Sequence, residues 1–298
     1  MRLDDYRTSD NVEDQGQGSG GGGFGGGGGG GGIFGLLFGI VASRFGIGGI
    51  VVLALGAMLF GMNPLSMITG GGAPTTQAPR TTGQSAAQVC TSEPAKKFSC
   101  QVLASTEDTW TKLFSERGQT YTPAGLSFYG GNGRSGCGAA QSAMGPFYCP
   151  TDKKIYLDTS FYNELQQRFG APGDFAQAYV IAHEVGHHIQ DLMGTLDQAR
   201  QAQQAVSETA GNAVQVKVEL QADCFAGVWA ARNPNLMSPG DVEEGIRAAA
   251  AIGDDTLQRQ SQGRVSPDSF THGSAAQRQL WLQRGLTTGD PAQCDTFA

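Results

Sequence analysis

The chain is divided by a long stretch that is almost free of charge. No Asp, Glu, Lys or Arg occurs between Asp14 and Arg44, or between Arg44 and Arg80. The start of this stretch, residues 16–32, is nearly all glycine, which cannot bury a core and predicts a flexible linker. A folded unit must therefore be built mainly from the residues C-terminal to this stretch, and roughly 210 residues are enough for one domain.

The same stretch contains an apolar segment. Residues 45–62 are uncharged and mostly apolar, and their number is within the range that crosses a bilayer core. We therefore expect residues 33–68 to be an uncleaved anchor region with one transmembrane helix, because the chain start is long and partly acidic, unlike a signal peptide. Arg44 precedes the span, so the positive-inside rule predicts a single-pass protein of the cell (inner) membrane, with a cytoplasmic N-terminus and an extracytoplasmic or periplasmic domain.

Composition sets the remaining boundaries. Residues 1–15 form a short charged tail, for which cytoplasmic disorder is the expectation. Residues 69–88 are rich in Gly, Thr, Pro and Gln and predict a second linker, so that residues 89–298 form the folded domain. The formal net charge of -7, without a basic stripe, argues against a nucleic-acid partner.

Six cysteines belong to the predicted domain. Their even number and the lack of a C-x-x-C pair favour disulfides in an oxidising compartment over a separate structural zinc site. Six cysteines allow fifteen connectivities. The pairs we expect are Cys90–Cys100, Cys137–Cys149 and Cys224–Cys294. The alternative for Cys224 is a thiolate ligand to zinc.

Three of the four histidines occur in AYVIAHEVGHHIQD, residues 178–191. In a helix, His183 and His187 lie one turn apart on one face, where both imidazoles can bind one zinc ion. Glu184 then lies beside the metal as the general base of a metallohydrolase. His188 points about 100° away, so we expect it on the helix surface or behind the ligands. The alternative is an exposed helix with incidental histidines.

A third ligand is expected because catalytic zinc usually has three protein ligands and one open position. In VKVELQADCFAGVWAA, residues 216–231, Glu219 and Asp223 are also four apart on an apolar helix. Glu219 can bind the zinc, while Asp223 can accept the free ring N–H of a ligand histidine. The alternative is two solvated carboxylates, which the apolar neighbours disfavour because isolated buried carboxylates are costly.

The pattern H-E-x-x-H followed by E-x-x-x-D resembles the gluzincin zinc peptidases. More closely, the chain is similar to a bacterial family of neutral zinc metallopeptidases, which are membrane-anchored proteins with a zincin-type domain. The similar blocks are SDNVED, GCGAAQSAMGPFYCP, GDFAQAYVIAHEVGHHIQ, ELQADCFAGVW, AAAAIGDDTLQRQSQGRV and PDSFTHGSAAQRQLW. The resemblance implies that His183, His187 and Glu219 are zinc ligands and that Glu184 is the base.

A few strands followed by helices predict an α+β domain, mostly helical with a small sheet, in agreement with the zincin-like fold that the resemblance implies. The expected strands are 126–129, 145–149 and 154–158. The expected helices are 106–117, 159–169, one from about 174, 198–232, 239–260 and 274–285. In the zincin fold an edge strand beside the active-site helix binds substrate backbone, and KIYLD, residues 154–158, is our candidate. The alternative is a plain sheet edge.

The predicted function is that of a membrane-anchored zinc endopeptidase acting on proteins or peptides. Water activated by zinc would lose its proton to Glu184, and His272 would donate a hydrogen bond to the oxyanion. A loop histidine with a structural hydrogen bond is the alternative for His272. Two other functions remain open, a catalytically silent zinc-binding scaffold of the same fold and a metal-dependent amidase acting on non-peptide amides. The intact Glu184 favours the enzyme.

Overall fold

The computed structural model describes residues 1–17 and 83–298. The predicted anchor region, residues 33–68, lies outside these residues, as do most of the two predicted linkers. Within the described part of the chain, no helix has both the length and the apolar character that a membrane crossing requires.

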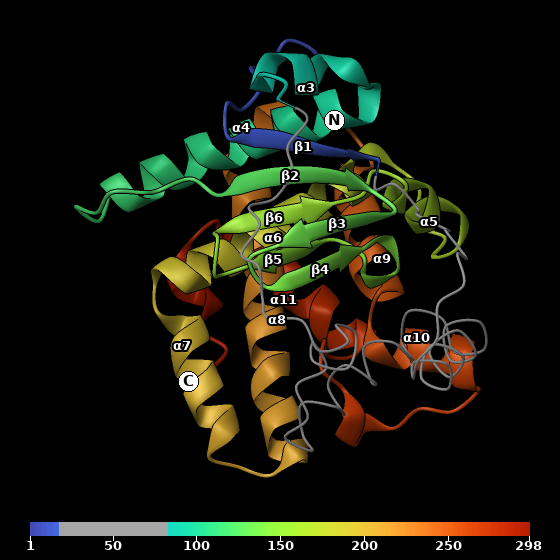
Figure 1. The fold of residues 1–298 in the computed structure, drawn as a ribbon. Helices are drawn as coiled ribbons and strands as arrows, with labels where there is room; N and C mark the ends of the chain where they lie inside the picture. The colour runs from blue at the N-terminus through green and yellow to red at the C-terminus, as the bar shows by residue number, and fades with distance from the viewer. Residues whose placement is uncertain (18–82) are drawn as a thin grey trace, which may run out of the picture.

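A small mixed sheet covers one side of a layer of helices (Figure 1). The strand order is β1-β2-β6-β5, in which β1, β2 and β6 are parallel and β5 is antiparallel to β6. The strands are β1 Val12–Gln17, β2 Gly125–Gly130, β5 Phe147–Cys149 and β6 Lys154–Leu157. A separate hairpin joins β3 Asn132–Ser135 and β4 Gly138–Gln141. The predicted α+β class, mostly helical with a small sheet, is confirmed.

The N-terminal tail forms strand β1, so the prediction of a disordered tail is wrong. Val12 pairs with Leu126 of β2. The Asp14 carboxylate, buried, lies 2.9 Å from Lys96 Nζ, and Gln101 Nε2 donates to the Leu3 carbonyl. Composition could not reveal these partners because they lie about a hundred residues away. Since β1 and β2 share one sheet, the N-terminal tail and the domain pack together as one unit in the described structure.

The helical layer is centred on two long helices, α6 Asp174–Leu192 and α8 Glu208–Arg232. Residues 218–230 of α8 are all buried, including the polar residues Glu219, Gln221 and Asp223. Helix α4 Pro94–Ser115 packs beside them, and α11 Ala275–Thr288 crosses α8 (Figure 1). The predicted helix 106–117 begins too late, because Pro94 occupies a first-turn position, where proline is favoured.

Two predicted helices are each divided in the structure. The segment 198–232 contains a break after α7 and before α8, and 239–260 contains one between α9 and α10. Gly253 allows the second break, since a Cβ there would lie 2.4 Å from the Ala275 backbone nitrogen. The remaining helices are α3 Ala86–Ser92, α5 Phe161–Gln167, α7 Thr195–Gln204, α9 Asp241–Ala251 and α10 Asp254–Gln262. Short 3-10 turns are η1 Ser142–Met144, η2 Pro234–Leu236, η3 Pro267–Ser269 and η4 Pro291–Cys294.

The two edge strands of the sheet are β1 and β5, and β6 is an inner strand, so the prediction of an edge at residues 154–158 is wrong. β6 pairs with β2 on one side and with β5 on the other. The sequence predicted both strands, but their order in the sheet depends on which strand pairs with β2. Tyr148 of β5 contacts α6, because its hydroxyl donates to Asp191 Oδ2 at 2.9 Å.

The three expected disulfides are confirmed. Cys90–Cys100 joins α3 to α4, Cys137–Cys149 joins the β3–β4 hairpin to β5, and Cys224–Cys294 joins α8 to η4. Because Cys224 is in a disulfide, it is not a zinc thiolate.

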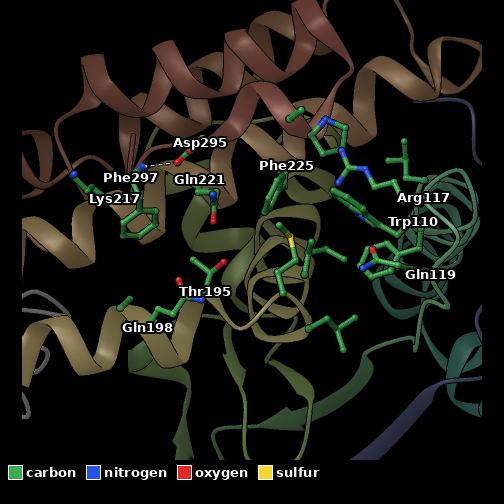
Figure 2. A pocket seen from close by; sticks show the side chains of 18 of the residues that line it. Trp110, Arg117, Gln119, Thr195, Gln198, Lys217, Gln221, Phe225, Asp295 and Phe297 are labelled. Atoms are coloured by element: carbon green, nitrogen blue, oxygen red, sulfur yellow. Dashed lines mark hydrogen bonds between the residues drawn. The ribbon is translucent and has the colours of Figure 1, made fainter.

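A pocket of about 1030 Å³ opens between α4, α7, α8 and the C-terminal segment (Figure 2). None of the predicted site residues lines it. The labelled lining residues in Figure 2 include Trp110, Thr195, Lys217, Phe225 and Phe297. The predicted chemistry therefore lies elsewhere in the domain.

Candidate metal centre

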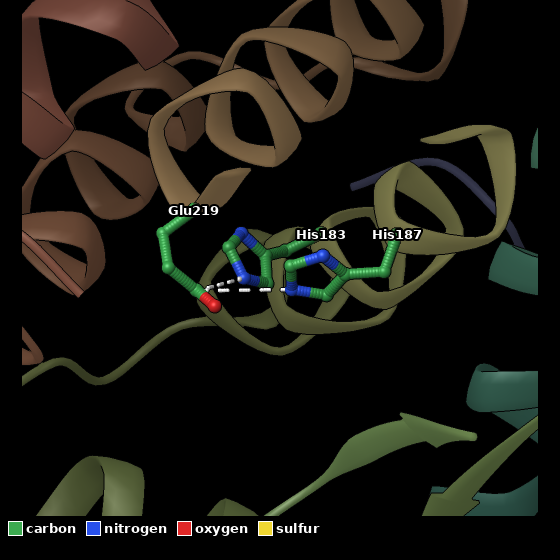
Figure 3. Close-up of side chains that lie close together, drawn as sticks. All are labelled: His183, His187 and Glu219. Carbon is green, nitrogen blue, oxygen red and sulfur yellow. Dashed lines mark hydrogen bonds and ion pairs between the residues drawn. The ribbon is translucent and has the colours of Figure 1, made fainter. Parts of the chain in front are cut away.

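The three predicted ligands converge at the contact between α6 and α8 (Figure 3). His183 Nε2 lies 3.2 Å from Glu219 Oε2, and His187 Nε2 lies 3.7 Å from the same oxygen. Gly186, between the two histidines, allows this close approach, because a Cβ there would lie 2.9 Å from the backbone of Ala222. The four-residue spacing places each pair of side chains on one face of its helix, and Gly186 allows the two helices to approach closely.

The donor set suits zinc. Bonds of 2.0–2.1 Å in a tetrahedral site place neighbouring ligand atoms roughly 3.4 Å apart, close to the two separations found here. The ligand side chains of His183, His187 and Glu219 are only 8, 14 and 8% exposed. Burial by itself would raise the pKa of Glu219, but the two imidazoles outweigh it and hold this pKa well below its ordinary value. An ionised carboxylate is the form that binds a metal.

Each ligand is held from behind by a hydrogen bond. Asp223 Oδ1 lies 2.8 Å from Nδ1 of His183, and Gln190 Oε1 lies 2.9 Å from Nδ1 of His187. These contacts leave the Nε2 atoms facing one another, which is the arrangement typical of metal-binding histidines. Glu219 is held as well, since Gln215 Nε2 donates to its Oε1 at 3.0 Å.

Asp223 is part of a buried network that the sequence did not predict. Arg278 of α11, 2% exposed, donates through Nε and Nη2 to the two oxygens of Asp223, each at 2.8 Å. The Tyr179 hydroxyl also donates to Asp223 Oδ1. Burial would raise the pKa of Asp223, but Arg278 and His183 lower it to about 2. No sequence signal marked Arg278, because a single arginine on a helix is usually solvated.

Glu184 lies beside the ligand pair without a partner of its own. It is 7% exposed, and in residues 1–17 and 83–298 no group donates a hydrogen bond to its side chain. Burial would lower the pKa of His187, but Glu219 and, less strongly, Glu184 raise it. A buried carboxylate without a donor is free to accept a proton from a water molecule at the site.

His188 is fully buried, so the alternative of a helix-surface position is wrong. Its Nε2 lies 2.7 Å from the Thr122 carbonyl oxygen, and its Nδ1 lies 2.9 Å from the Tyr148 hydroxyl. His188 therefore joins the ligand helix to strand β5 and does not belong to the ligand set.

His272 lies in the loop before α11, with a side chain that is 40% exposed. Asp254 Oδ2 accepts three backbone N–H groups of this loop, from Thr271, His272 and Gly273, at 2.6–3.0 Å. Burial would lower the pKa of His272, but Asp254 and the charge of Glu219 raise it. Asp254 therefore fixes the loop that carries the His272 ring.

A second group of carboxylates in the described part of the chain has protein partners instead. Asp174 contacts the Met1 amine, and Asp241 lies 3.5 Å from the same amine. Glu244 Oε2 accepts the N–H of Phe175 in the first turn of α6 at 3.1 Å. These contacts already use the three carboxylates, so we assign the metal centre to the histidine pair.

Comparisons with known proteins point to one family. A family model described as "Putative neutral zinc metallopeptidase" matches residues 1–297, so the match includes the tail that forms β1. The chain is 49% identical over 257 residues to "Uncharacterized protein YpfJ" of Escherichia coli K12, covering 85% of this chain and 87% of that protein. It is 40% identical over 265 residues to "Uncharacterized protein Rv2575" of Mycobacterium tuberculosis H37Rv, covering 81% and 85%. No solved structure matches the chain.

Proposed function

Because the chain belongs to the family of putative neutral zinc metallopeptidases, we propose that it hydrolyses peptide bonds at the site formed by His183, His187, Glu219 and Glu184. One observation carries the proposal. Three ligand atoms from two helices lie within 4.8 Å of one another, and an unpartnered carboxylate lies beside them. A purely structural metal site would have no use for that carboxylate.

The roles of the residues depend on their surroundings. Zinc held by the three ligands would acidify water and polarise the scissile carbonyl. Glu184 accepts the proton of the attacking water and later delivers it to the leaving amine. His272 donates a hydrogen bond to the oxyanion, because Asp254 fixes the loop that carries its ring.

The substrate is an extended peptide that pairs with the outer edge of β5, as in zincin-like domains. In the described residues no strand pairs with β5 on the side away from β6. Tyr148 and His188 hold this edge against the ligand helix. Main-chain pairing would bring the peptide backbone along the sheet toward α6, with alternate side chains directed to either face.

The proposed location is outside the cytoplasm. The three disulfides support an oxidising compartment. We propose, from the sequence alone, that residues 33–68 contact the bilayer. We do not propose that these residues cross the membrane once, because a single crossing would place the paired strands β1 and β2 on opposite sides of the membrane.

The deciding experiment replaces the proposed base. Full-length Glu184→Gln protein should bind one zinc ion per chain and unfold at the wild-type temperature, because size and shape are kept. Its rate of cleavage of unfolded protein substrates, followed by mass spectrometry, should fall by about 10²-fold or more. Glu164→Gln, on the surface helix α5, is the control and should cleave like wild type.

Two outcomes would contradict the proposal. Cleavage by Glu184→Gln at the wild-type rate would exclude Glu184 as the base. A zinc-loaded wild-type protein that cleaves no peptide, with full rescue of a deletion strain by Glu184→Gln, would instead establish the scaffold function.

A further inference from the structure

A chain of buried hydrogen bonds runs from His187 to the C-terminal segment. Gln190 Oε1 lies 2.9 Å from His187 Nδ1, and Gln190 Nε2 donates to the Val218 carbonyl at 2.7 Å and to Gln221 Oε1 at 3.0 Å. Gln221 Nε2 in turn donates to the Cys294 carbonyl at 3.0 Å. Gln190 is fully buried and Gln221 is 6% exposed, so water does not compete for these contacts.

The two backbone carbonyls fix the direction of every hydrogen bond in this chain. A carbonyl oxygen can only accept, so the amide nitrogens of Gln190 and Gln221 must face Val218 and Cys294. The amide oxygen of Gln190 must then face His187. The ring can complete this contact only with a proton on Nδ1, which leaves the lone pair of a neutral imidazole on Nε2.

We infer that Gln190 is a positioning residue for the ligand His187, and that Gln221 and the Cys294 carbonyl hold Gln190 in its working orientation. This inference rests on the proposed metal site. Gln190 selects the tautomer and the ring angle in which His187 Nε2 faces Glu219, at 3.7 Å from Oε2. It also links the proposed metal site to η4 through Gln221 and the Cys294 carbonyl.

The two ligand histidines are therefore held by different chemistry. The partner of His183 is the charged pair Asp223–Arg278, whereas the partner of His187 is a neutral carboxamide. A carboxylate makes a ligand histidine more basic than an amide does, and both fix the ring. Replacing Gln190 should thus change mainly the orientation and tautomer of His187.

The test measures zinc affinity of full-length protein by competition with a zinc indicator after removal of metal. Gln190→Met keeps the volume but removes the acceptor, and should weaken zinc binding by about 10–100-fold, the usual effect of losing such a partner. Gln190→Glu keeps an acceptor for His187 and should bind zinc more tightly than Gln190→Met. Gln177→Met, elsewhere on α6, is the matched control and should match wild type.

A second readout separates positioning from packing. Cobalt loaded in place of zinc should give an altered visible spectrum in Gln190→Met, because the ligand geometry changes, but an unaltered spectrum in Gln177→Met. If Gln190→Met fails to fold, Gln221→Met tests the same series of hydrogen bonds from its other end. This variant should also weaken zinc binding. Wild-type zinc affinity and spectrum in the folded variants would overturn the inference. A wild-type protein without zinc affinity would refute the proposed function itself, so the two failures are distinguishable.

Discussion

Gly227 of α8 and Gly285 of α11 face each other where the two helices cross. A Cβ on Gly227 would lie 2.3 Å from the Leu282 carbonyl oxygen, and a Cβ on Gly285 would lie 2.0 Å from the Cys224 carbonyl oxygen. Neither position has room for a methyl group, because the obstacles are backbone atoms. This close crossing is what allows Arg278 to reach the buried side of α8.

Gly285→Ala should lower the free energy of unfolding by about 2 kcal/mol or more, because the added methyl group forces the two backbones apart. Gly211→Ala, in the first part of α8, is the control. Its Cβ would meet only ordinary contacts, at 3.7 Å and beyond. It should stabilise the protein by about 0.5–1 kcal/mol, since alanine is the better helix former. Urea denaturation measures the free energy of unfolding of both variants. Equal effects of the two substitutions would contradict the close contact between α8 and α11 at Gly227 and Gly285.

Glu219→Ala should abolish stoichiometric zinc binding, because two imidazoles alone form an incomplete site. Metal content after dialysis against a weak chelator measures the loss. Glu208→Ala, in the first turn of the same helix, should retain one zinc per chain. Full zinc content in folded Glu219→Ala protein would remove Glu219 from the ligand set.

Arg278→Met should destabilise the domain by about 3–5 kcal/mol, because it leaves the buried Asp223 carboxylate without its charged partner. Adding Asp223→Asn to this variant should restore part of the stability, since the unpaired charge is then gone. Arg284→Met, at an exposed position of α11, should have no such effect. Thermal unfolding of wild type, Arg278→Met, Asp223→Asn and the double variant forms a double-mutant cycle. Arg284→Met is the surface control, and strict additivity within the cycle would argue against the pair.

The tail and the domain should be labelled from the same side of the membrane. All six cysteines form disulfides, so Asp10→Cys and Gln260→Cys each introduce a single thiol at an exposed position. A membrane-impermeant maleimide applied to intact spheroplasts should label both variants, because β1 and β2 share one sheet. Labelling of Gln260→Cys alone would restore the single-crossing topology.

Asp158→Asn should lower stability by about 1–2 kcal/mol at neutral pH, because charged acceptors make stronger hydrogen bonds. Asp158 accepts the N–H groups of Gly131 and Ser160, each at 2.9 Å, and the Ser142 hydroxyl. Burial would raise the pKa of Asp158, but these donors lower it below its ordinary value.

The stabilisation is therefore present above about pH 4 and is lost as the pH falls through the pKa of the folded state. Wild type and Asp158→Asn should thus converge in acid, whereas Asp197→Asn, at an exposed site on α7, should match wild type throughout. A constant difference between wild type and Asp158→Asn at every pH would contradict the role of the charge.

The sequence predicted which residues meet between α6 and α8 because the information for each helix is local. His183, His187 and Glu184 are placed by one helical turn, and Glu219 and Asp223 by another. What brings the two turns together is tertiary packing, and the only local hint of it is Gly186. The supporting residues were missed for the same reason: Gln190, Gln221 and Arg278 have ordinary helical surroundings in the sequence, and their partners lie on other elements.

The errors in the fold also concern long-range pairing. The tail lacks a hydrophobic pattern of its own, and β1 exists because its backbone meets β2. Residues 154–158 have the composition of any short strand, so their composition could not tell an inner strand from an edge. Two of the three disulfides, by contrast, join cysteines only 10 and 12 residues apart, and all three expected pairs are present in the structure.

The Cys224–Cys294 disulfide determines what happens when another protease cuts this protein between the two cysteines. Residues 259–269 are all exposed and are the part of this covalent loop most open to cutting. A cut there would place Glu219 on one fragment and His272 on the other, yet the disulfide would keep the two fragments as one molecule. A protein cut once in this segment would therefore migrate as two bands in gel electrophoresis only after reduction. The residues of its candidate metal centre would stay in one disulfide-linked molecule after the cut.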